Sequence, residues 1–290
     1  MHVLILGAGF SGQAIATAMM RRAHSVTGTT RAATKREALE ALGIRPLIFD
    51  GETIGPELAE AMARTTHLVQ SIAPGAAGDP LFRADRPPLA AMMPNLAWAG
   101  YLSTVGVYGD HDGAWVDEDT PCRPASTRSL ERIAAEDAWL GFSRESGIPV
   151  AVLRLSGIYG PGRNALCNLA EGTARRLVKP GQVFNRIRVE DIGAVTDFLA
   201  ARGLGGVYNV TDDSPGPPQD VVAYAADLMG VERPPAIAFE NAVLSEMARS
   251  FYGENKRVSN ARLRGLGFTF RFPDYRMSLE DLWRTGRWSG

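Results

Sequence analysis

Lysine is scarce in this chain. The 290 residues include Lys35, Lys179 and Lys256 and no other lysine, so arginine carries almost all of the positive charge. The two signs nearly cancel, with 31 Lys and Arg against 32 Asp and Glu and a net charge of −1. This balance does not favour nucleic acid or an anionic membrane as a partner.

Cysteine is scarce as well, and no apolar run is long enough to cross a membrane. Cys122 and Cys167 are far apart and lack metal-ligand spacing, so we expect incidental thiols, no metal site and a cytoplasmic location. The first apolar stretch has the length of a strand and no basic leader, unlike a signal peptide or a membrane helix. The remaining composition, 45% hydrophobic and 22% charged, is that of a globular protein.

The most informative stretch opens the chain. An apolar run over 3–6 indicates a buried strand, Gly7, Gly9 and Gly12 follow at G-x-G-x-x-G spacing, and 13–22 has a helical pattern. This context favours a dinucleotide site over a plain strand-to-helix turn, because the glycines permit a tight turn, close approach of a pyrophosphate and close helix packing. The residues expected at the cofactor in this loop are Gly7, Gly9, Phe10, Ser11 and Gly12.

The end of the second expected strand, 25–29, decides between the two nicotinamide dinucleotides. An NAD site usually places a carboxylate there for the ribose 2′-hydroxyl, whereas this chain has Thr29, Thr30 and Arg31. A guanidinium pairs with a 2′-phosphate, and the threonine hydroxyls are further donors. We therefore favour NADP over NAD; the alternative is a solvated arginine at the start of a helix.

Further strands are expected over 45–49, 66–72 and 100–103, and a helix interrupted by two prolines over 80–96. Strands and helices alternate, which favours an α/β fold of Rossmann type with a doubly wound parallel sheet. Asp50 follows one strand and is expected either to bind adenine or to form a simple turn. The loop Ser71, Ile72 and Ala73 follows another and is expected to lie at the carboxyl ends of the strands, against the cofactor.

Several blocks between residues 101 and 210 have an order that matches one family. They are YLSTVGVYG at 101–109, VDEDTP at 116–121, LRLSGIYGPG at 153–162, NRIRVEDI at 185–192 and GVYNV at 206–210. Together they resemble the extended short-chain dehydrogenase/reductase superfamily, also called the NAD-dependent epimerase/dehydratase family. The resemblance implies a Rossmann domain over 1–160, completed by about 182–210, and a smaller substrate lobe formed by 161–181 and 211–290.

The resemblance fails at the residues that carry the superfamily's chemistry. Its Tyr-x-x-x-Lys pair corresponds to Arg128 and Arg132, and no lysine lies between Lys35 and Lys179. An arginine does not donate a proton near neutral pH. Thr104 matches the superfamily's catalytic Ser or Thr, and Arg132 remains able to hold a ribose hydroxyl or a substrate anion.

Other groups are candidates for the missing acid or base. Tyr108 is expected on the loop after the fifth strand, either as a proton donor or as a residue packed over the cofactor, and Tyr159 has the same ambiguity. His111 is the histidine nearest to that loop. A literal Tyr-x-x-x-Lys occurs at Tyr252 and Lys256, but it lies far beyond the sheet, and we interpret it as coincidence or as part of the substrate lobe.

The substrate lobe is expected to contain helices over 164–177 and 219–229. Within the blocks that resemble the superfamily, Tyr159, Arg163 and Arg188 are the expected substrate contacts, with Arg186 beside them. Arg188 stands where a histidine is usual. Arginines at these positions indicate an anionic ligand, with a nucleotide-sugar as one example.

Two functions remain open. The first is an NADP(H)-binding oxidoreductase or epimerase/dehydratase-like enzyme with an altered acid/base group, Thr104 and Tyr108 being the best candidates. The second is a catalytically silent NADP(H)-binding sensor or regulatory protein. Membership of the superfamily favours the enzyme, whereas the loss of the Tyr/Lys pair is expected of the sensor. A homodimer is a further expectation, from the resemblance alone.

Overall fold

A parallel sheet carries the glycine-rich loop. The structure is a computed structural model that describes residues 1–245, 249 and 251–290. Seven strands lie in the order β11-β7-β5-β4-β1-β2-β3, and every neighbouring pair from β5 to β3 is parallel. The strands are β1 (His2–Leu6), β2 (Ser25–Thr30), β3 (Arg45–Ile48), β4 (His67–Gln70), β5 (Trp98–Thr104), β7 (Val150–Leu155) and β11 (Gly206–Val210).

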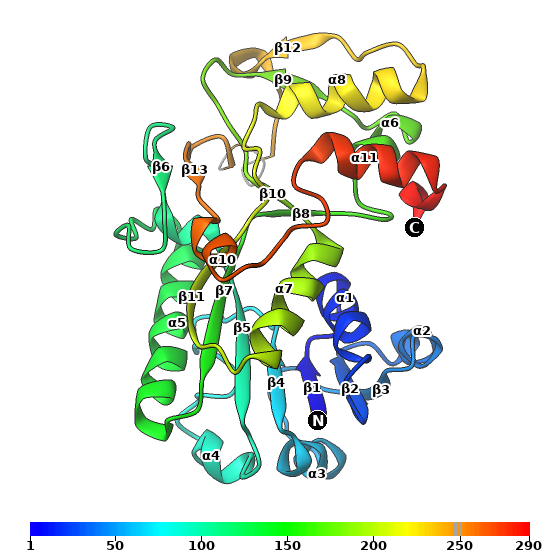
Figure 1. Cartoon of the computed structure of the whole chain (residues 1–290). Helices are drawn as coiled ribbons and strands as arrows, with labels where there is room; N and C mark the ends of the chain where they lie inside the picture. The colour runs from blue at the N-terminus through cyan, green and yellow to red at the C-terminus, as the bar shows by residue number, and fades with distance from the viewer. Residues whose placement is uncertain (246–248, 250) are drawn as a thin grey trace. The chain divides into compact units, whose positions relative to one another are not determined.

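The order of the strands fixes where a ligand binds. From β1 the chain moves outward through β2 to β3 and then returns to the other side of β1 as β4 (Figure 1). The order of the strands therefore reverses between β1 and β4, which pair in parallel. In open α/β sheets, ligands bind in the crevice at the carboxyl ends of such a pair of strands. The loops that leave β1 and β4 begin at Gly7 and Ser71.

Helices cover this sheet as the alternation of patterns predicts. They are α1 (Phe10–Met19), α2 (Arg36–Ala41), α3 (Pro56–Arg64), α4 (Leu89–Met92), α5 (Thr127–Ser146) and α7 (Val189–Ala201). Side chains of α3, α4 and α5 share one buried apolar cluster with the strands, including Met62, Leu89 and Trp139. On α7, Gly193 faces α1 so closely that a Cβ would lie 2.5 Å from the Ala14 carbonyl oxygen. The prediction of an α/β fold of Rossmann type is confirmed.

The expected helix over 80–96 was wrong for most of its length. Only Leu89–Met92 is helical, and residues 79–88 form an irregular loop. Pro87 and Pro88 restrict the backbone and lack N–H donors, which prevents a helix from starting earlier. The loop is held instead by buried side chains, among them Asp79 and Leu81.

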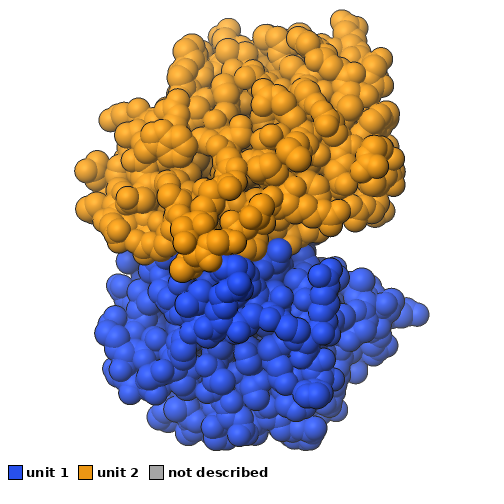
Figure 2. Space-filling model, viewed as in Figure 1, with its two compact units in different colours: residues 1–107, 124–154, 192–208 blue, residues 108–123, 155–191, 209–290 orange. Residues whose placement is uncertain are grey.

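The chain divides into two compact units, coloured separately in Figure 2. The first comprises 1–107, 124–154 and 192–208, and the second comprises 108–123, 155–191 and 209–290. The segment 108–123, which follows β5, thus belongs to the second unit, whereas the sequence-based boundaries place it in the first.

Short strands and four helices form the described part of the second unit. The strands are β6 (Trp115–Val116), β8 (Gly157–Tyr159), β9 (Arg176–Val178), β10 (Arg186–Arg188), β12 (Ala236–Ala238) and β13 (Arg257–Val258). The helices are α6 (Ala165–Ala170), α8 (Pro218–Met229), α10 (Ala261–Gly265) and α11 (Tyr275–Arg284). Leu166, Ala225, Leu279 and Leu282 pack α6, α8 and α11 into one apolar cluster. None of the helices in the described ranges is both long and apolar enough to span a membrane.

The expected helix over 164–177 is shorter than predicted. α6 ends at Ala170, Gly172 adopts a left-handed conformation with φ +68°, and the chain then forms β9. Arg176 to Val178 pair in parallel with β12. The pairing of β9 thus overrides the helical pattern that the sequence suggests for its last residues.

Candidate functional site

The glycine-rich loop has the geometry of a phosphate-binding turn. Gly7 has φ +88°, a conformation that favours glycine, and its N–H donates to Thr29 Oγ1 at 2.8 Å. A Cβ on Gly12 would lie 2.6 Å from the Gly7 carbonyl oxygen, so only glycine allows α1 to approach the turn. Thr29, at the end of β2, also accepts from Ala8 N through its carbonyl oxygen at 2.7 Å.

The same loop leaves room for a ligand at its tip. A Cβ on Gly9 would meet no described atom within 4 Å, so the space beside this residue is open. α1 begins immediately after it, without a side-chain cap and without an acidic residue in its first turn. An uncapped helix N-terminus with positive partial charge suits a pyrophosphate. These residues therefore fit a dinucleotide, with Phe10 and Ser11 in the first turn of α1.

The end of β2 carries an uncommitted guanidinium. Arg31 is exposed and makes no hydrogen bond or ion pair with any residue that the structure describes. Thr30 precedes it, and its Oγ1 accepts from Ala32 N at 3.3 Å. No Asp or Glu occurs between the end of β2 and Glu37. The charged side chain nearest to the end of this strand is therefore the guanidinium of Arg31.

At the end of β3, Asp50 forms a turn. Its Oδ1 accepts from Glu52 N at 2.8 Å and from Thr53 N at 3.1 Å. These backbone hydrogen bonds lower the pKa of Asp50 below its usual value. One carboxylate oxygen is thus engaged in the turn, which is the simpler of the two roles expected for this residue.

The loop after β4 lies directly against the glycine-rich turn. A Cβ on Gly7 would lie 3.1 Å from Ile72 Cγ1 and 3.3 Å from Ile72 N. Ser71 N donates to the Leu6 carbonyl oxygen at 2.9 Å, which continues the pairing of β4 with β1. Ser71 and Ile72 are half-buried and Ala73 is exposed. The structure therefore brings two of the predicted cofactor loops together within the first unit.

Thr104 and Arg132 follow in the same unit, from β5 and α5. Thr104 Oγ1 accepts from Gly106 N at 3.1 Å, and a Cβ on Gly106 would lie 3.5 Å from Ser129 Oγ, so two hydroxyls flank this glycine. Arg132 Nη1 donates to the Leu102 carbonyl oxygen at 2.6 Å and to Tyr101 Oη at 3.3 Å. One nitrogen of the guanidinium is thereby fixed to the end of β5.

Tyr108 is a buried residue of the second unit. Its ring is fully buried, and its hydroxyl donates to Asn209 Oδ1 at 2.7 Å. Asn209 N in turn donates to Glu118 Oε1 at 2.8 Å. These contacts hold the Tyr108 side chain within the packing of the second unit, with its hydroxyl engaged by Asn209.

The two remaining candidates near this loop are also engaged in local contacts. His111 Nε2 lies 3.1 Å from the Tyr108 carbonyl oxygen. Lys256 is buried, and its Nζ donates to the Gly109 carbonyl oxygen at 2.7 Å and to Glu254. Tyr252 and Lys256 are both buried and contribute to the packing of the second unit.

A cavity of about 470 Å³ lies within the second unit. Tyr159, Arg163 and Arg186 line it, together with the polar residues Asn164, Asn168 and Glu171 and the apolar residues Val221, Val222 and Leu279. The Tyr159 hydroxyl is buried without a hydrogen bond of normal geometry in the described part of the chain, with the Ser278 side chain as a polar neighbour. Burial raises the pKa of its phenol. The cavity therefore combines two guanidinium groups with a hydroxyl that lacks a partner.

Arg186 is the most deeply placed of these cations. Its Nη1 donates to the carbonyl oxygens of Phe184 and Gly216, and burial lowers its pKa. The nearby carboxyl of Asp212 is buried as well, its Oδ2 has no hydrogen bond among the described residues, and burial raises its pKa well above the usual value. A deprotonated Asp212 offsets the charge of Arg186, whereas a protonated one leaves the cavity positive.

Arg188 does not line that cavity. It is fully buried and donates to Glu190 at 2.6 and 2.7 Å and to Ser278 Oγ at 2.9 Å, and its guanidinium lies 4.2 Å from the centre of the Phe272 ring. A further contact to Asp281 at 3.5 Å joins it to α11. These contacts give Arg188 a structural role in holding α11, in place of the substrate contact expected from its position.

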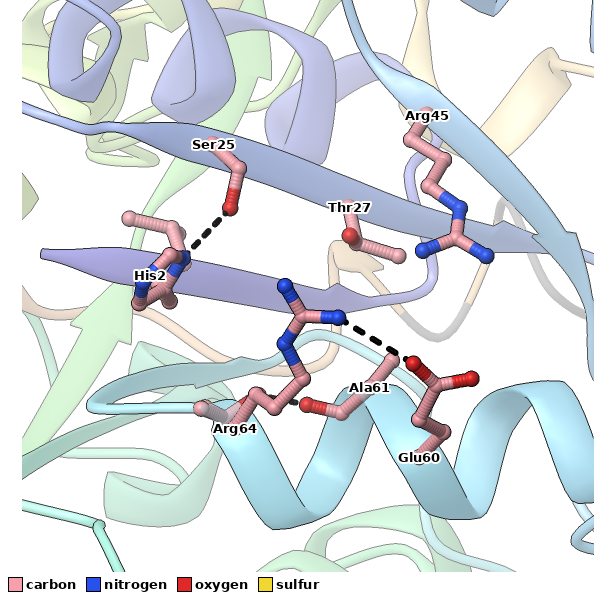
Figure 3. Close-up of a pocket in the computed structure, with 9 residues that line it drawn as sticks. His2, Ser25, Thr27, Arg45, Glu60, Ala61 and Arg64 are labelled. Atoms are coloured by element: carbon pink, nitrogen blue, oxygen red, sulfur yellow. Dashed lines mark hydrogen bonds and ion pairs between the residues drawn. The ribbon is translucent and has the colours of Figure 1, made fainter.

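A second, smaller cavity lies at the opposite ends of the strands (Figure 3). It measures about 110 Å³, and its walls come from the amino-terminal ends of β1, β2 and β3 and from the end of α3. Arg64 pairs with Glu60 at 3.1 Å, and His2 Nδ1 lies 2.8 Å from Ser25 Oγ. Ligands of open α/β sheets bind at the carboxyl ends of the strands, so this cavity is not the dinucleotide site.

Comparison with known proteins agrees with this geometry. A profile of the NAD dependent epimerase/dehydratase family matches residues 95–210. The protein YeeZ of Escherichia coli strain K12 is 31% identical over 289 residues, which cover 94% of this chain and 96% of YeeZ. The chain belongs to the extended short-chain dehydrogenase/reductase superfamily.

Solved structures of this superfamily share the fold over the full length. A functionally unknown conserved protein from Silicibacter pomeroyi is 45% identical with a TM-score of 0.87, and 98% of each chain is covered. A putative NAD-dependent epimerase/dehydratase from Methylobacillus flagellatus is 26% identical with a TM-score of 0.72, again over 98% of each chain. The human epimerase family protein SDR39U1, solved with NADPH, is 19% identical with a TM-score of 0.73 and shows the fold alone.

Among the superfamily's catalytic positions, this chain has an unusual pair. α5 places exposed Arg128 and half-buried Arg132 one turn apart, at the positions that the sequence predicts to correspond to the superfamily's tyrosine and lysine. Among the described residues no group of three or more His, Cys, Asp or Glu side chains is arranged to hold a metal ion.

Sequence analysis missed residues that hold these elements in place. Asp212 lies near the cavity of the second unit, and Gln70 and Asp79 support the loop after β4. Thr29 was expected as a donor to a 2′-phosphate, whereas its buried hydroxyl accepts from the Gly7 N–H of the glycine-rich turn. A hydroxyl at the end of β2 and the Asp212-Asp213 dipeptide after β11 were visible signals. Burial of Asp79 was not visible, because its partners are distant in the sequence.

Proposed function

We propose that the protein is an NADP(H)-dependent oxidoreductase or epimerase/dehydratase-like enzyme that acts on a small anionic substrate without a Tyr/Lys pair. The observation that carries the substrate class is the cavity of the second unit, where Arg163 and Arg186 accompany the partnerless hydroxyl of Tyr159. Guanidinium groups recognise carboxylates and phosphates through paired hydrogen bonds. Nucleotide-sugars and sugar acids are the first compounds to test.

The choice of NADP rests on Arg31. Its guanidinium is uncommitted at the end of β2, where an NAD site requires a carboxylate to accept from the ribose 2′-hydroxyl. A 2′-phosphate supplies the anion that Arg31 lacks, and the Thr30 hydroxyl lies beside it. Similar solved structures hold either dinucleotide, NADPH in the human protein and NAD in the dTDP-glucose 4,6-dehydratase of Bacillus anthracis, so the preference rests on Arg31.

The reaction then depends on Thr104 and Arg132. A bound nicotinamide supplies or accepts hydride. Thr104 offers a hydroxyl to orient a substrate oxygen, and the guanidinium nitrogens of Arg132 that β5 does not occupy can hold a ribose hydroxyl or a substrate anion. Because neither group exchanges a proton readily near neutral pH, we expect modest rates or a substrate that brings its own acid.

The test is a direct search for turnover. Purified protein with NADPH or NADP⁺ is mixed with carbonyl compounds, sugar acids and nucleotide-sugars, while nicotinamide absorbance reports net redox and chromatography reports redox-neutral epimerisation. We expect turnover of an anionic compound that falls at least tenfold in Arg163→Ala, with no change in the control Arg202→Ala on the first unit. Turnover of neutral compounds alone contradicts the proposed substrate class.

A silent NADP(H) sensor is the second candidate, favoured by the replacement of the Tyr/Lys pair by Arg128 and Arg132. It predicts tight NADPH binding and no turnover with any compound. Restoring the pair distinguishes the two functions. If Arg128→Tyr combined with Arg132→Lys gives activity to a protein that had none, the fold has kept a substrate site and lost its proton donor, as the sensor requires.

A further inference from the structure

A buried carboxylate links three elements of the first unit. Asp79 is 3% exposed and accepts three hydrogen bonds. Gln70 Nε2 donates to its Oδ1 at 3.0 Å, Leu81 N donates to the same oxygen at 2.9 Å, and Trp139 Nε1 donates to Oδ2 at 3.1 Å. The donors come from β4, from the loop 79–88 and from α5. Burial raises the pKa of this carboxyl, and the three donors favour its charged form.

Gln70 links Asp79 to the loop 71–73, which lies against the glycine-rich turn. It is the last residue of β4 and is fully buried. While its Nε2 is bound to Asp79, its Oε1 accepts from Ile72 N at 3.0 Å. Ile72 N is the atom that a Cβ on Gly7 would approach to 3.3 Å. The orientation of the Gln70 amide therefore sets the position of the loop 71–73 against the glycine-rich turn.

Trp139, on α5, links Asp79 to Tyr101 and through it to Arg132. Its indole lies 6.1 Å from the Tyr101 ring with an interplanar angle of 21°, a stacked geometry. Tyr101 Oη accepts from Arg132, whose guanidinium lies 5.9 Å from the centre of the same ring. Phe82, in the loop 79–88, packs edge-on against Trp139, with 4.7 Å between the ring centres. Asp79 thus stands between the loop at Gly7 and the arginine that replaces the superfamily's lysine.

We propose that Asp79 is a positioning residue of the dinucleotide site. It fixes the Gln70 amide, and through Gln70 the Ile72 N–H and the loop 71–73, and it ties this loop to α5 through Trp139. The proposal rests on binding of a nicotinamide dinucleotide and not on the reaction proposed above. A carboxylate suits this place because one oxygen accepts two bonds while the other accepts the indole N–H, an arrangement that no amide or aliphatic side chain reproduces.

The test variant is Asp79→Asn. In either orientation of the new amide its NH₂ group faces a donor, on one side Gln70 Nε2 with Leu81 N and on the other the indole N–H of Trp139, so the bonds that hold Gln70 and Trp139 cannot both be kept. We expect the dissociation constant of NADPH to rise roughly fivefold to tenfold, as the loss of about one buried hydrogen bond predicts. We also expect faster amide hydrogen exchange at Ile72 in the protein without nucleotide. Asp85→Asn, an exposed position in the same loop, is the matched control and should change neither value.

Two further variants separate positioning from general stability. Gln70→Met removes the residue that links Asp79 to the loop 71–73, so the double variant with Asp79→Asn should weaken NADPH binding by clearly less than the sum of the two single effects. Trp139→Phe removes only the bond to Oδ2 from the unaltered Asp79 and should weaken binding less than Asp79→Asn. It also keeps the test available if Asp79→Asn does not fold. The proposal is overturned if Asp79→Asn or Trp139→Phe lowers the melting temperature with an unchanged dissociation constant, or if the effects of Asp79→Asn and Gln70→Met add.

Discussion

Ile72 lies against Gly7 with no room for a side chain between them. A Cβ on Gly7 would approach Ile72 Cγ1 to 3.1 Å, and Gly7 has φ +88°. The loop after β4 and the turn after β1 thus form one surface on the first unit, at the point where the order of the strands reverses. This contact defines the edge at which the account places the nicotinamide dinucleotide.

The glycines of this turn should separate stability from binding. In Gly12→Ala the new methyl group would meet the Gly7 carbonyl oxygen at 2.6 Å, so we expect a loss of about 1–3 kcal/mol in the free energy of unfolding together with weaker NADPH binding. In Gly9→Ala the methyl group meets no described atom within 4 Å, so the melting temperature should stay unchanged while NADPH binding is lost. Thermal denaturation and calorimetry measure both. Unchanged NADPH binding in Gly9→Ala would mean that the open space beside Gly9 is not the pyrophosphate site.

The Tyr159 hydroxyl should matter for ligand binding and not for folding. Because it is buried without a hydrogen bond in the described ranges, Tyr159→Phe should leave the melting temperature unchanged or slightly raised. The affinity for an anionic substrate should fall about fivefold to tenfold if the hydroxyl donates to that ligand. A lower melting temperature would show that the hydroxyl has a partner in the folded protein and would remove it from the binding site.

Tyr108 should behave in the opposite way. Tyr108→Phe removes the donor to Asn209 Oδ1 in a buried place, so we expect a loss of about 1–3 kcal/mol in the free energy of unfolding. The pH dependence of any turnover should not change, since the hydroxyl is engaged in that bond. If instead the variant is stable and one limb of the pH profile disappears, Tyr108 is the acid or base that replaces the lost tyrosine.

Asp212 gives a prediction for stability against pH. Burial raises its pKa well above the usual 3.8, so the folded state binds the proton more tightly than the unfolded chain. The stability that this proton contributes is complete below a pH of about 3.8 and is lost as the pH rises through the raised value. The melting temperature of the wild type relative to Asp212→Asn should therefore fall as the pH is raised from 4 to 8.

The exposed carboxylate of Asp137 on α5 supplies the control for this measurement. The difference between the wild type and Asp137→Asn should stay constant over the same pH range. The opposite result, a wild type that gains stability relative to Asp212→Asn as the pH rises, would contradict this prediction. It would show that Asp212 is charged in the folded protein and that its carboxylate offsets the positive charge of Arg186.

The course of the sheet could be predicted from the sequence because its signals are local. The glycine spacing, the apolar runs and the alternation of strands and helices each depend on neighbouring residues, and they placed β1, β2 and α8 to within a few residues. The helix expected over 80–96 failed because Pro87 and Pro88 prevent a start before Leu89, and because contacts of Asp79 and Leu81 with other elements hold the preceding segment as a loop. Tertiary contacts override local pattern there.

The supporting residues of the site were beyond sequence reasoning for the same reason. Asp79 lies 9 positions from Gln70 and 60 from Trp139, a separation that matches no motif. Arg188 occupies a position that suggests a ligand contact, and only its full burial among Glu190, Ser278 and Phe272 shows its structural role. The type and spacing of residues identify side chains that contact a ligand more readily than the buried side chains that hold those residues in position.

The central claim, a site for NADP(H), is tested most directly by calorimetric titration with NADPH and with NADH, on the wild type and on Arg31→Ala. The account predicts that NADPH binds at least about tenfold more tightly than NADH, because a charge-assisted contact to the 2′-phosphate contributes about 1.5–3 kcal/mol. In Arg31→Ala the affinity for NADPH should fall to that for NADH, while Arg36→Ala, an exposed arginine of α2, should change neither. Equal binding of the two nucleotides, unaffected by Arg31→Ala, would contradict the choice of NADP, and binding of neither would contradict the site itself.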